Sequence, residues 1–225
     1  ASGTIPIVLE ENYSQTITPV TMRDMDSDGK TTIGYHQKTT STDNGKLRIL
    51  SDYTYLYDGT FYGGTTYQYE TSGDNTIEIL CTLNKDSTIY EKRVMKIDPD
   101  GKTISSSVYD GDGTLLTKTT YEYNEHGKLI SGNTYDHNKV LISIDNWEYD
   151  DNDRQVLWIC YNADGSIYHK TVTEYFEDER FIAHSTIFNP DGSIMNNYSL
   201  EYDGQELVKK TYYNPDGTVK EVIEY

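Results

Sequence analysis

Apolar and polar residues alternate with a period of two in short blocks, and each block ends at a polar turn. Between residues 97 and 225 an aromatic residue recurs about every 13 positions. In complete copies, a glycine follows four positions later and an aliphatic residue six positions later, as in Tyr213, Gly217 and Val219. Strict alternation is typical of half-buried strands, and blocks of about eight residues are too short for helices. The pattern therefore predicts consecutive β-hairpins with almost no helix.

The turn residues predict one kind of hairpin connection. In Asn214-Pro215-Asp216-Gly217, proline presets φ at the second turn position, aspartate suits the third, and glycine takes the left-handed position. This combination predicts a type I turn closed by a glycine bulge, with Tyr213 and Val219 facing each other across the ladder. Tyr135 and Tyr149 head copies that keep the spacing but lack the glycine.

Two turns make one repeat of about 26 residues. We expect an all-β fold in which about 14 to 16 antiparallel strands, in sequential hairpins, form one long twisted or superhelical sheet. Residues 1–19 contain two prolines and little alternation, and we expect an irregular lead-in or cap there. The remainder is predicted to be a single domain over 20–225, with diverged repeats in 20–96 and regular repeats in 97–225.

A two-layer β-sandwich or a closed barrel is the alternative fold. An open sheet leaves an unpaired edge, such as the final strand from Val219 to Tyr225, and such an edge invites pairing with another chain unless it is covered. Self-association through this edge is therefore one expected interaction. The low aliphatic content favours the open sheet, because a sandwich needs a thick apolar core.

Composition supports a thin sheet. Hydrophobic residues make up 35% of the chain, and 22 tyrosines stand beside 4 phenylalanines and 2 tryptophans. Tyrosine has an apolar ring and a polar hydroxyl, so it suits a half-buried pleated surface better than a dry core.

The charge balance limits the partners. Lysine and arginine total 19 against 37 acidic residues, which gives a formal net charge of −18. We therefore expect no nucleic-acid partner, although many of the acids fall in predicted turns, where aspartate bonds to nearby backbone. Apolar runs are too short to span a membrane. The chain begins at Ala1 without a methionine, and we expect an exported protein.

One acidic segment matches half of a calcium loop. Asp24, Asp26 and Asp28 alternate before a glycine, an arrangement that lets oxygens converge on a hard cation. Thr32 and Tyr35 stand where the second half of the loop would supply ligands, so an acidic hairpin turn is the competing interpretation. Calcium is the one cofactor that the sequence suggests. Asp150, Asp151 and Asp153 form a second acidic group that could gather a cation.

The two cysteines, Cys81 and Cys160, are predicted to be free thiols. About three repeats separate them, and six strands at about 4.8 Å would place them near 29 Å apart in an open array. A disulfide requires Cα atoms within about 7 Å, so no bridge is expected.

The candidate ligand site is aromatic. Trp147 and Trp158 belong to one predicted hairpin, and counting the alternation through the turn puts them on opposite faces, one packed and one exposed. With Tyr149 and Tyr161 they could form a platform for sugar rings or protein loops. The competing interpretation is that the tyrosines form a ladder that stacks within the array. The chain lacks zinc spacings, nucleophile elbows, phosphate loops and dinucleotide fingerprints.

The segments Tyr109–Leu115 and Tyr123–Leu129 share the order Tyr-Asx-x-x-Gly-x-Leu. This motif resembles the YD repeats of bacterial RHS-type surface and toxin-shell proteins, and more broadly MORN-like bacterial hairpin repeats, over roughly residues 97 to 225. Lys128 stands where YD repeats commonly carry arginine. The resemblance implies a coiling antiparallel sheet in a protein secreted by a bacterium or held on its surface, and it implies no active site.

These observations together predict a non-catalytic, exported bacterial repeat module with a binding or structural role, whose ligand is a glycan or a protein. Two alternatives stay open. One is a carbohydrate-active or other hydrolase built on a β scaffold, since a fold does not exclude an activity. The other is a shell or scaffold part of a toxin-type surface protein.

Overall fold

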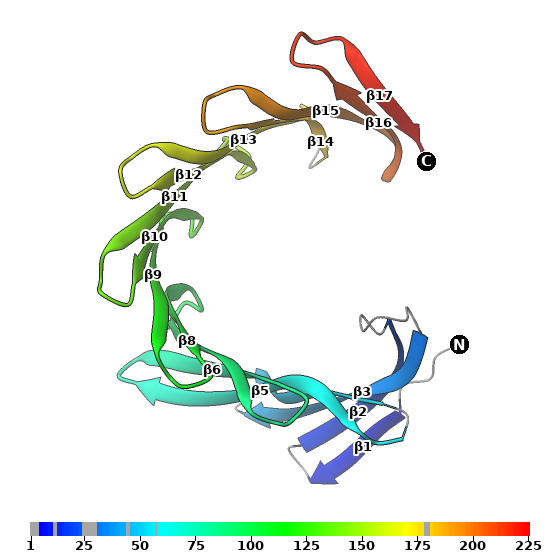
Figure 1. Cartoon of the computed structure of the whole chain (residues 1–225), viewed down its shortest axis with the longest axis vertical. Helices are drawn as coiled ribbons and strands as arrows, with labels where there is room; N and C mark the ends of the chain where they lie inside the picture. The colour runs from blue at the N-terminus through cyan, green and yellow to red at the C-terminus, as the bar shows by residue number, and fades with distance from the viewer. Residues whose placement is uncertain (1–4, 11–12, 24–30, 44–45, 57, 178–180) are drawn as a thin grey trace. The chain divides into compact units, whose positions relative to one another are not determined.

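The computed structural model describes residues 5–10, 13–23, 31–43, 46–56, 58–177 and 181–225 (Figure 1). These residues form 17 strands and contain no helix. The strands are β1 (Ile5–Glu10), β2 (Tyr13–Arg23), β3 (Thr31–Asp43), β4 (Lys46–Leu56), β5 (Phe61–Ser72), β6 (Asn75–Leu83), β7 (Ile89–Ile97), β8 (Thr103–Asp110), β9 (Leu115–Tyr123), β10 (Leu129–Asp136), β11 (Leu141–Tyr149), β12 (Gln155–Asn162), β13 (Ile167–Tyr175), β14 (Ile182–Phe188), β15 (Ile194–Asp203), β16 (Glu206–Tyr213) and β17 (Val219–Glu224).

The strands belong to one open antiparallel sheet in which neighbours in the chain pair with each other. The prediction of an all-β sheet of sequential hairpins is confirmed, with 17 strands in place of about 14 to 16. Two compact units divide the chain, unit 1 over residues 1–118 and unit 2 over residues 119–225. Within each unit the hairpins follow one another side by side (Figure 1).

Each unit is one layer thick. Among the described residues no hydrophobic side chain is buried, and the buried polar residues are Ser106, Ser185 and Thr211. These small side chains sit in mid-strand, in β8, β14 and β16. A two-layer sandwich would bury apolar side chains between its sheets, so this alternative does not describe the fold. Both faces of the sheet are therefore accessible surfaces.

One turn type recurs ten times in the described part of the chain. In each turn the N–H of the first residue donates to the carbonyl of the fifth, and the N–H of the fourth donates to the carbonyl of the first. The turns span residues 56–60, 84–88, 98–102, 110–114, 124–128, 136–140, 150–154, 162–166, 189–193 and 214–218. The first two lie within the segment predicted to be diverged, so the regular turn begins well before residue 97.

The fourth turn residue is always left-handed. Glycine holds this position in seven turns, while Ser87, Lys139 and Asp153 hold it in the other three, with φ of 67°, 65° and 61°. The copies without glycine thus keep both the spacing and the conformation. Tyr213 pairs with Val219 across the last turn, as predicted.

An extra residue follows each of these turns where the register is described. In the β11–β12 hairpin, Tyr149 pairs with Gln155 and Glu148 pairs with Leu157, so Val156 has no partner. The same shift occurs in the β10–β11, β12–β13 and β14–β15 hairpins. Alternation therefore cannot be counted through a turn, because the bulge reverses it. The prediction that Trp147 and Trp158 lie on opposite faces is wrong: they pair directly and share one face.

The irregular lead-in expected over residues 1–19 contains strand β1 and most of β2 instead. Both prolines of this segment lie in strands. Pro6 belongs to β1, where it pairs with Thr16, and Pro19 lies in β2, where it pairs with Tyr35 of β3.

Candidate functional site

The centre of the candidate site is the directly opposed pair Trp147 on β11 and Trp158 on β12. On one side, two rings lie beside Gly132 of β10. A Cβ atom at Gly132 would lie 3.5 Å from Cη2 of Trp147 and 3.6 Å from Cδ1 of Tyr121, so both rings approach the backbone there. On the other side, the His169 ring lies 4.7 Å from the Trp158 ring between centroids. We call Tyr121, Trp147, Trp158 and His169 the aromatic strip.

Polar groups accompany the strip on the same face. Asp145, Cys160 and His169 stand directly opposite one another on β11, β12 and β13. The indole Nε1 of Trp158 donates to Oδ1 of Asp145 at 2.9 Å. The His169 Nε2 atom lies 2.9 Å from the hydroxyl of Thr171. The strip thus combines ring surfaces with a carboxylate, an imidazole and a hydroxyl.

Cys160 is held as a thiol. Partial burial, followed by the Asp145 carboxylate beside it, raises the pKa of Cys160 from 9.0 to about 11. The thiolate is the nucleophilic form, so Cys160 is poorly suited to nucleophilic catalysis at neutral pH even though a histidine and an aspartate flank it. Both Cys81 and Cys160 are free thiols.

Three of the four residues predicted for the platform come together. Tyr149 lies two residues beyond Trp147 on β11 and shares its face by alternation. Tyr161 pairs with Ile144, the neighbour of Asp145, and therefore lies on the opposite face. Sequence reasoning missed Tyr121, Asp145 and His169. The cross-strand register would have found them, but the register depends on the bulge after each turn.

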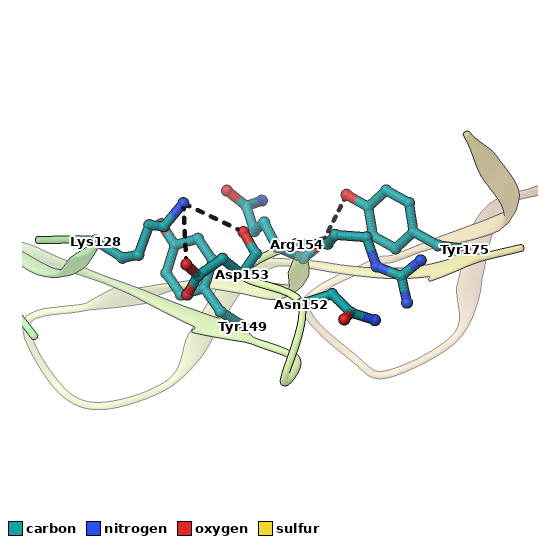
Figure 2. A pocket seen from close by; sticks show the side chains of 7 residues that line it. Lys128, Tyr149, Asn152, Asp153, Arg154 and Tyr175 are labelled. Carbon is teal, nitrogen blue, oxygen red and sulfur yellow. Dashed lines mark hydrogen bonds and ion pairs between the residues drawn. The ribbon is translucent and has the colours of Figure 1, made fainter. Parts of the chain in front are cut away.

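A polar pocket adjoins Tyr149 at the turn between β11 and β12 (Figure 2). Its volume is about 460 Å³, and its lining is Lys128, Tyr149, Asn152, Asp153, Arg154, Gln155 and Tyr175. Figure 2 shows Lys128 and Tyr149 at one end of the pocket lining and Tyr175 at the other, with the turn residues between them. The Tyr149 hydroxyl donates to the carbonyl of Leu129 at 2.9 Å, and the Tyr175 hydroxyl donates to that of Gln155 at 3.0 Å.

Two acidic residues of this turn, Asp150 and Asp153, have partners. Asp150 Oδ1 accepts the backbone N–H groups of Asn152 and Arg154 at 3.0 and 2.9 Å, and its Oδ2 accepts Arg154 Nε at 2.6 Å. Asp153 lies 3.3 Å from His126 Nδ1 and 3.9 Å from Lys128 Nζ. These carboxylates therefore serve the turn and its neighbours. The predicted calcium ligands Asp24, Asp26 and Asp28 lie outside the described residues.

Among the described residues, no group of three or more histidines, cysteines, aspartates or glutamates is arranged to hold a metal ion. Nor does the described part of the chain contain a helix with the length and apolar character needed to cross a bilayer.

A protein-family model described as "Uncharacterised protein" matches residues 53–162. A porin-like protein from Bacteroides uniformis has a similar solved structure, with a TM-score of 0.46 and 12% sequence identity, covering 96% of this chain and 90% of that one. No curated protein matches the chain. The resemblance to YD and MORN-like repeats stays a prediction.

Proposed function

We propose that this protein is an exported bacterial binding module that holds a glycan on the aromatic strip and performs no catalysis. The observation that carries the proposal is the direct pairing of Trp147 with Trp158 on one face of a single-layer sheet. A sheet without a second layer leaves these rings half-buried and reachable from solvent. Rigid aromatic rings offer a sugar a large contact area at low entropy cost.

The polar groups of the strip suit sugar hydroxyls. Ligand sites combine aromatic walls with a few placed polar groups that fix orientation. Here Asp145 supplies acceptor oxygens, and His169 and Thr171 supply groups that donate or accept. The net charge of −18 disfavours an anionic glycan, so the proposed ligand is neutral.

The residues of the aromatic strip support hydrolysis less well than they support glycan binding. Most glycosidases need two carboxyl groups about 5 to 10 Å apart on either side of the scissile bond. Asp145 is the carboxylate that flanks the tryptophan pair, and it is bonded to Trp158. A thiol with a pKa of about 11 does not replace the second group.

A glycan array followed by calorimetry on the best neutral ligand tests the proposal. Trp147→Ala should weaken binding about tenfold or more, because a stacked ring contributes about 1 kcal/mol or more beyond its buried area. The matched control is Tyr161→Ala, which removes an aromatic ring from the opposite face of the same hairpin.

The control variant should keep wild-type affinity. Binding of no glycan would overturn the proposal and favour a protein ligand or a purely structural role in a shell. Equal losses in the two variants would show that the ligand does not lie on the strip. Hydrolysis of the bound glycan would restore the enzyme alternative.

A further inference from the structure

A row of exposed apolar side chains occupies one position of successive hairpins. Tyr90, Leu116, Ile142, Tyr168 and Met195 are the second residues of β7, β9, β11, β13 and β15. Their exposed fractions are 65%, 45%, 42%, 63% and 61%. They stand 26, 26, 26 and 27 residues apart, one for each repeat. Tyr90 and Leu116 belong to unit 1, and the other three to unit 2.

The bulge after each turn explains why these residues are uncovered. Ile142, Tyr168 and Met195 are the extra residues of their hairpins and have no cross-strand partner. The bulge itself does not require a large apolar side chain, because Lys220 takes the same place in the β16–β17 hairpin. At the other end of the sheet, the extra residues Val156 and Ala183 are half-buried. The apolar row is thus a property of one end.

Acidic turns border this row. The turns that precede Ile142, Tyr168 and Met195 contain Asp136, Asp164 and Asp191, while Lys139 and His137 are their basic residues. Hydrogen bonds from Ser166 and Ser193 lower the pKa of Asp164 and Asp191, and the backbone N–H of Val140 lowers that of Asp136. All three carboxylates are therefore charged at neutral pH. Together with the net charge of −18, they disfavour a second copy or an anionic membrane as occupant.

We propose that Ile142, Tyr168 and Met195 form a docking ridge for an extended polypeptide segment that carries both apolar and basic side chains. Equivalent residues two strands apart are separated by about 10 Å, which is close to the roughly 9 Å that three residues of a polyproline II segment span. That conformation has three residues per turn, so every third side chain returns to the same face. The segment should therefore place an apolar residue at every third position, where it packs on the ridge. Basic residues between them face the turn carboxylates. This surface is separate from the aromatic strip.

Three labelled synthetic peptides test the ridge by fluorescence anisotropy with the full chain. One repeats Leu-Lys-Ser, the second Leu-Glu-Ser and the third Ser-Lys-Ser. We expect the first to bind, with affinity that falls as salt rises, and the other two to bind at least tenfold more weakly. The double variant Tyr168→Ser and Met195→Ser should lose at least tenfold in affinity for Leu-Lys-Ser.

The matched control is Val222→Ser on β17, which removes an apolar side chain of 45% exposure outside the ridge and should leave binding unchanged. Trp147→Ala should also bind the peptide normally, so failure of the glycan proposal leaves this test intact. The proposal is overturned if the double variant binds Leu-Lys-Ser as tightly as the wild type does. It is also overturned if the wild type binds Leu-Glu-Ser as tightly as Leu-Lys-Ser. If the wild type binds no peptide but self-associates, and the double variant does not self-associate, the ridge is instead an interface between copies of the chain. Binding to neutral vesicles in place of peptide would likewise overturn the proposal.

Discussion

Unit 1 and unit 2 each contain an aromatic cluster, and the two clusters are built differently. In unit 1, Tyr35 of β3 stacks on Tyr55 of β4 with centroids 5.2 Å apart. Phe61 of β5 packs edge-to-face against Tyr53 and Tyr55 at 5.7 and 5.6 Å. The unit 1 rings thus contact one another. In the unit 2 strip, Trp158 contacts the His169 ring and also bonds to the carboxylate of Asp145, while Trp147 lies beside Gly132.

This difference separates two uses of aromatic residues in a sheet with one layer. Rings that pack on each other replace the missing core and contribute to stability. Rings set among glycine, carboxylate and hydroxyl groups are the ones that we propose for ligand binding. The ring contacts of unit 1 fit the expectation that tyrosines stack within the array. The platform interpretation of the tryptophan pair in unit 2 stays a proposal.

The largest expected effect is loss of stability in unit 1. Tyr55→Ala removes a ring that contacts Tyr35, Tyr53 and Phe61, and should lower the free energy of unfolding by about 2 to 4 kcal/mol. Trp147→Ala in unit 2 should cost about half as much, because fewer rings surround it. Urea unfolding followed by circular dichroism measures both. Equal losses would mean that the strip is also a packing cluster.

Two glycines give a finer test with matched substitutions. Gly64 pairs with Tyr53, and a Cβ atom there would lie 2.5 Å from the carbonyl oxygen of Asp52 and 2.6 Å from Cδ1 of Tyr53. Gly64→Ala must therefore displace backbone or ring and should cost about 1 to 3 kcal/mol. Gly132→Ala meets its nearest neighbour at 3.5 Å, an ordinary contact, and should change stability by less than about 1 kcal/mol. Urea unfolding measures both variants. A larger loss of unfolding free energy for Gly132→Ala than for Gly64→Ala would contradict the difference between the two clusters.

Local turn chemistry made most of the fold predictable. The Asx and glycine spacing located the hairpins, and the pairing of Tyr213 with Val219 followed from one turn. The position of each side chain depends on register, which the sequence shows less directly. A single extra residue such as Val156 reverses the face of everything beyond it, and this is why the faces of Trp147 and Trp158 were assigned wrongly.

The sequence shows which residues of the candidate site are unusual, but it does not show which other residues lie beside them. Tryptophan is rare in this chain, so Trp147 and Trp158 stood out. Asp145 and His169 carry no local signal, because they join the site through pairing across β11, β12 and β13. Tyr161 resembled Tyr149 in its repeat position, yet it heads a turn at the other end of the sheet and faces the other way. Residues that meet across strands are found once register is known.

The smallest expected effect is a difference between the two clusters in how stability changes at alkaline pH. Burial, with Tyr35 and Tyr53 close by, raises the pKa of Tyr55 above its usual value of 10.0. Between that value and the higher folded pKa, the folded protein keeps a proton that the unfolded chain releases, so stability falls as pH rises above about 10. Tyr55→Phe keeps the ring and removes the ionisable hydroxyl. It should leave stability near neutral pH almost unchanged and make the alkaline decline shallower.

Trp158→Phe is the control variant. It exchanges one ring without a phenol for another, so its alkaline decline in stability should match that of the wild type. Thermal unfolding between pH 8 and 11 measures the slopes, and identical slopes for Tyr55→Phe and wild type would show that the unit 1 cluster does not resist ionisation of its central ring.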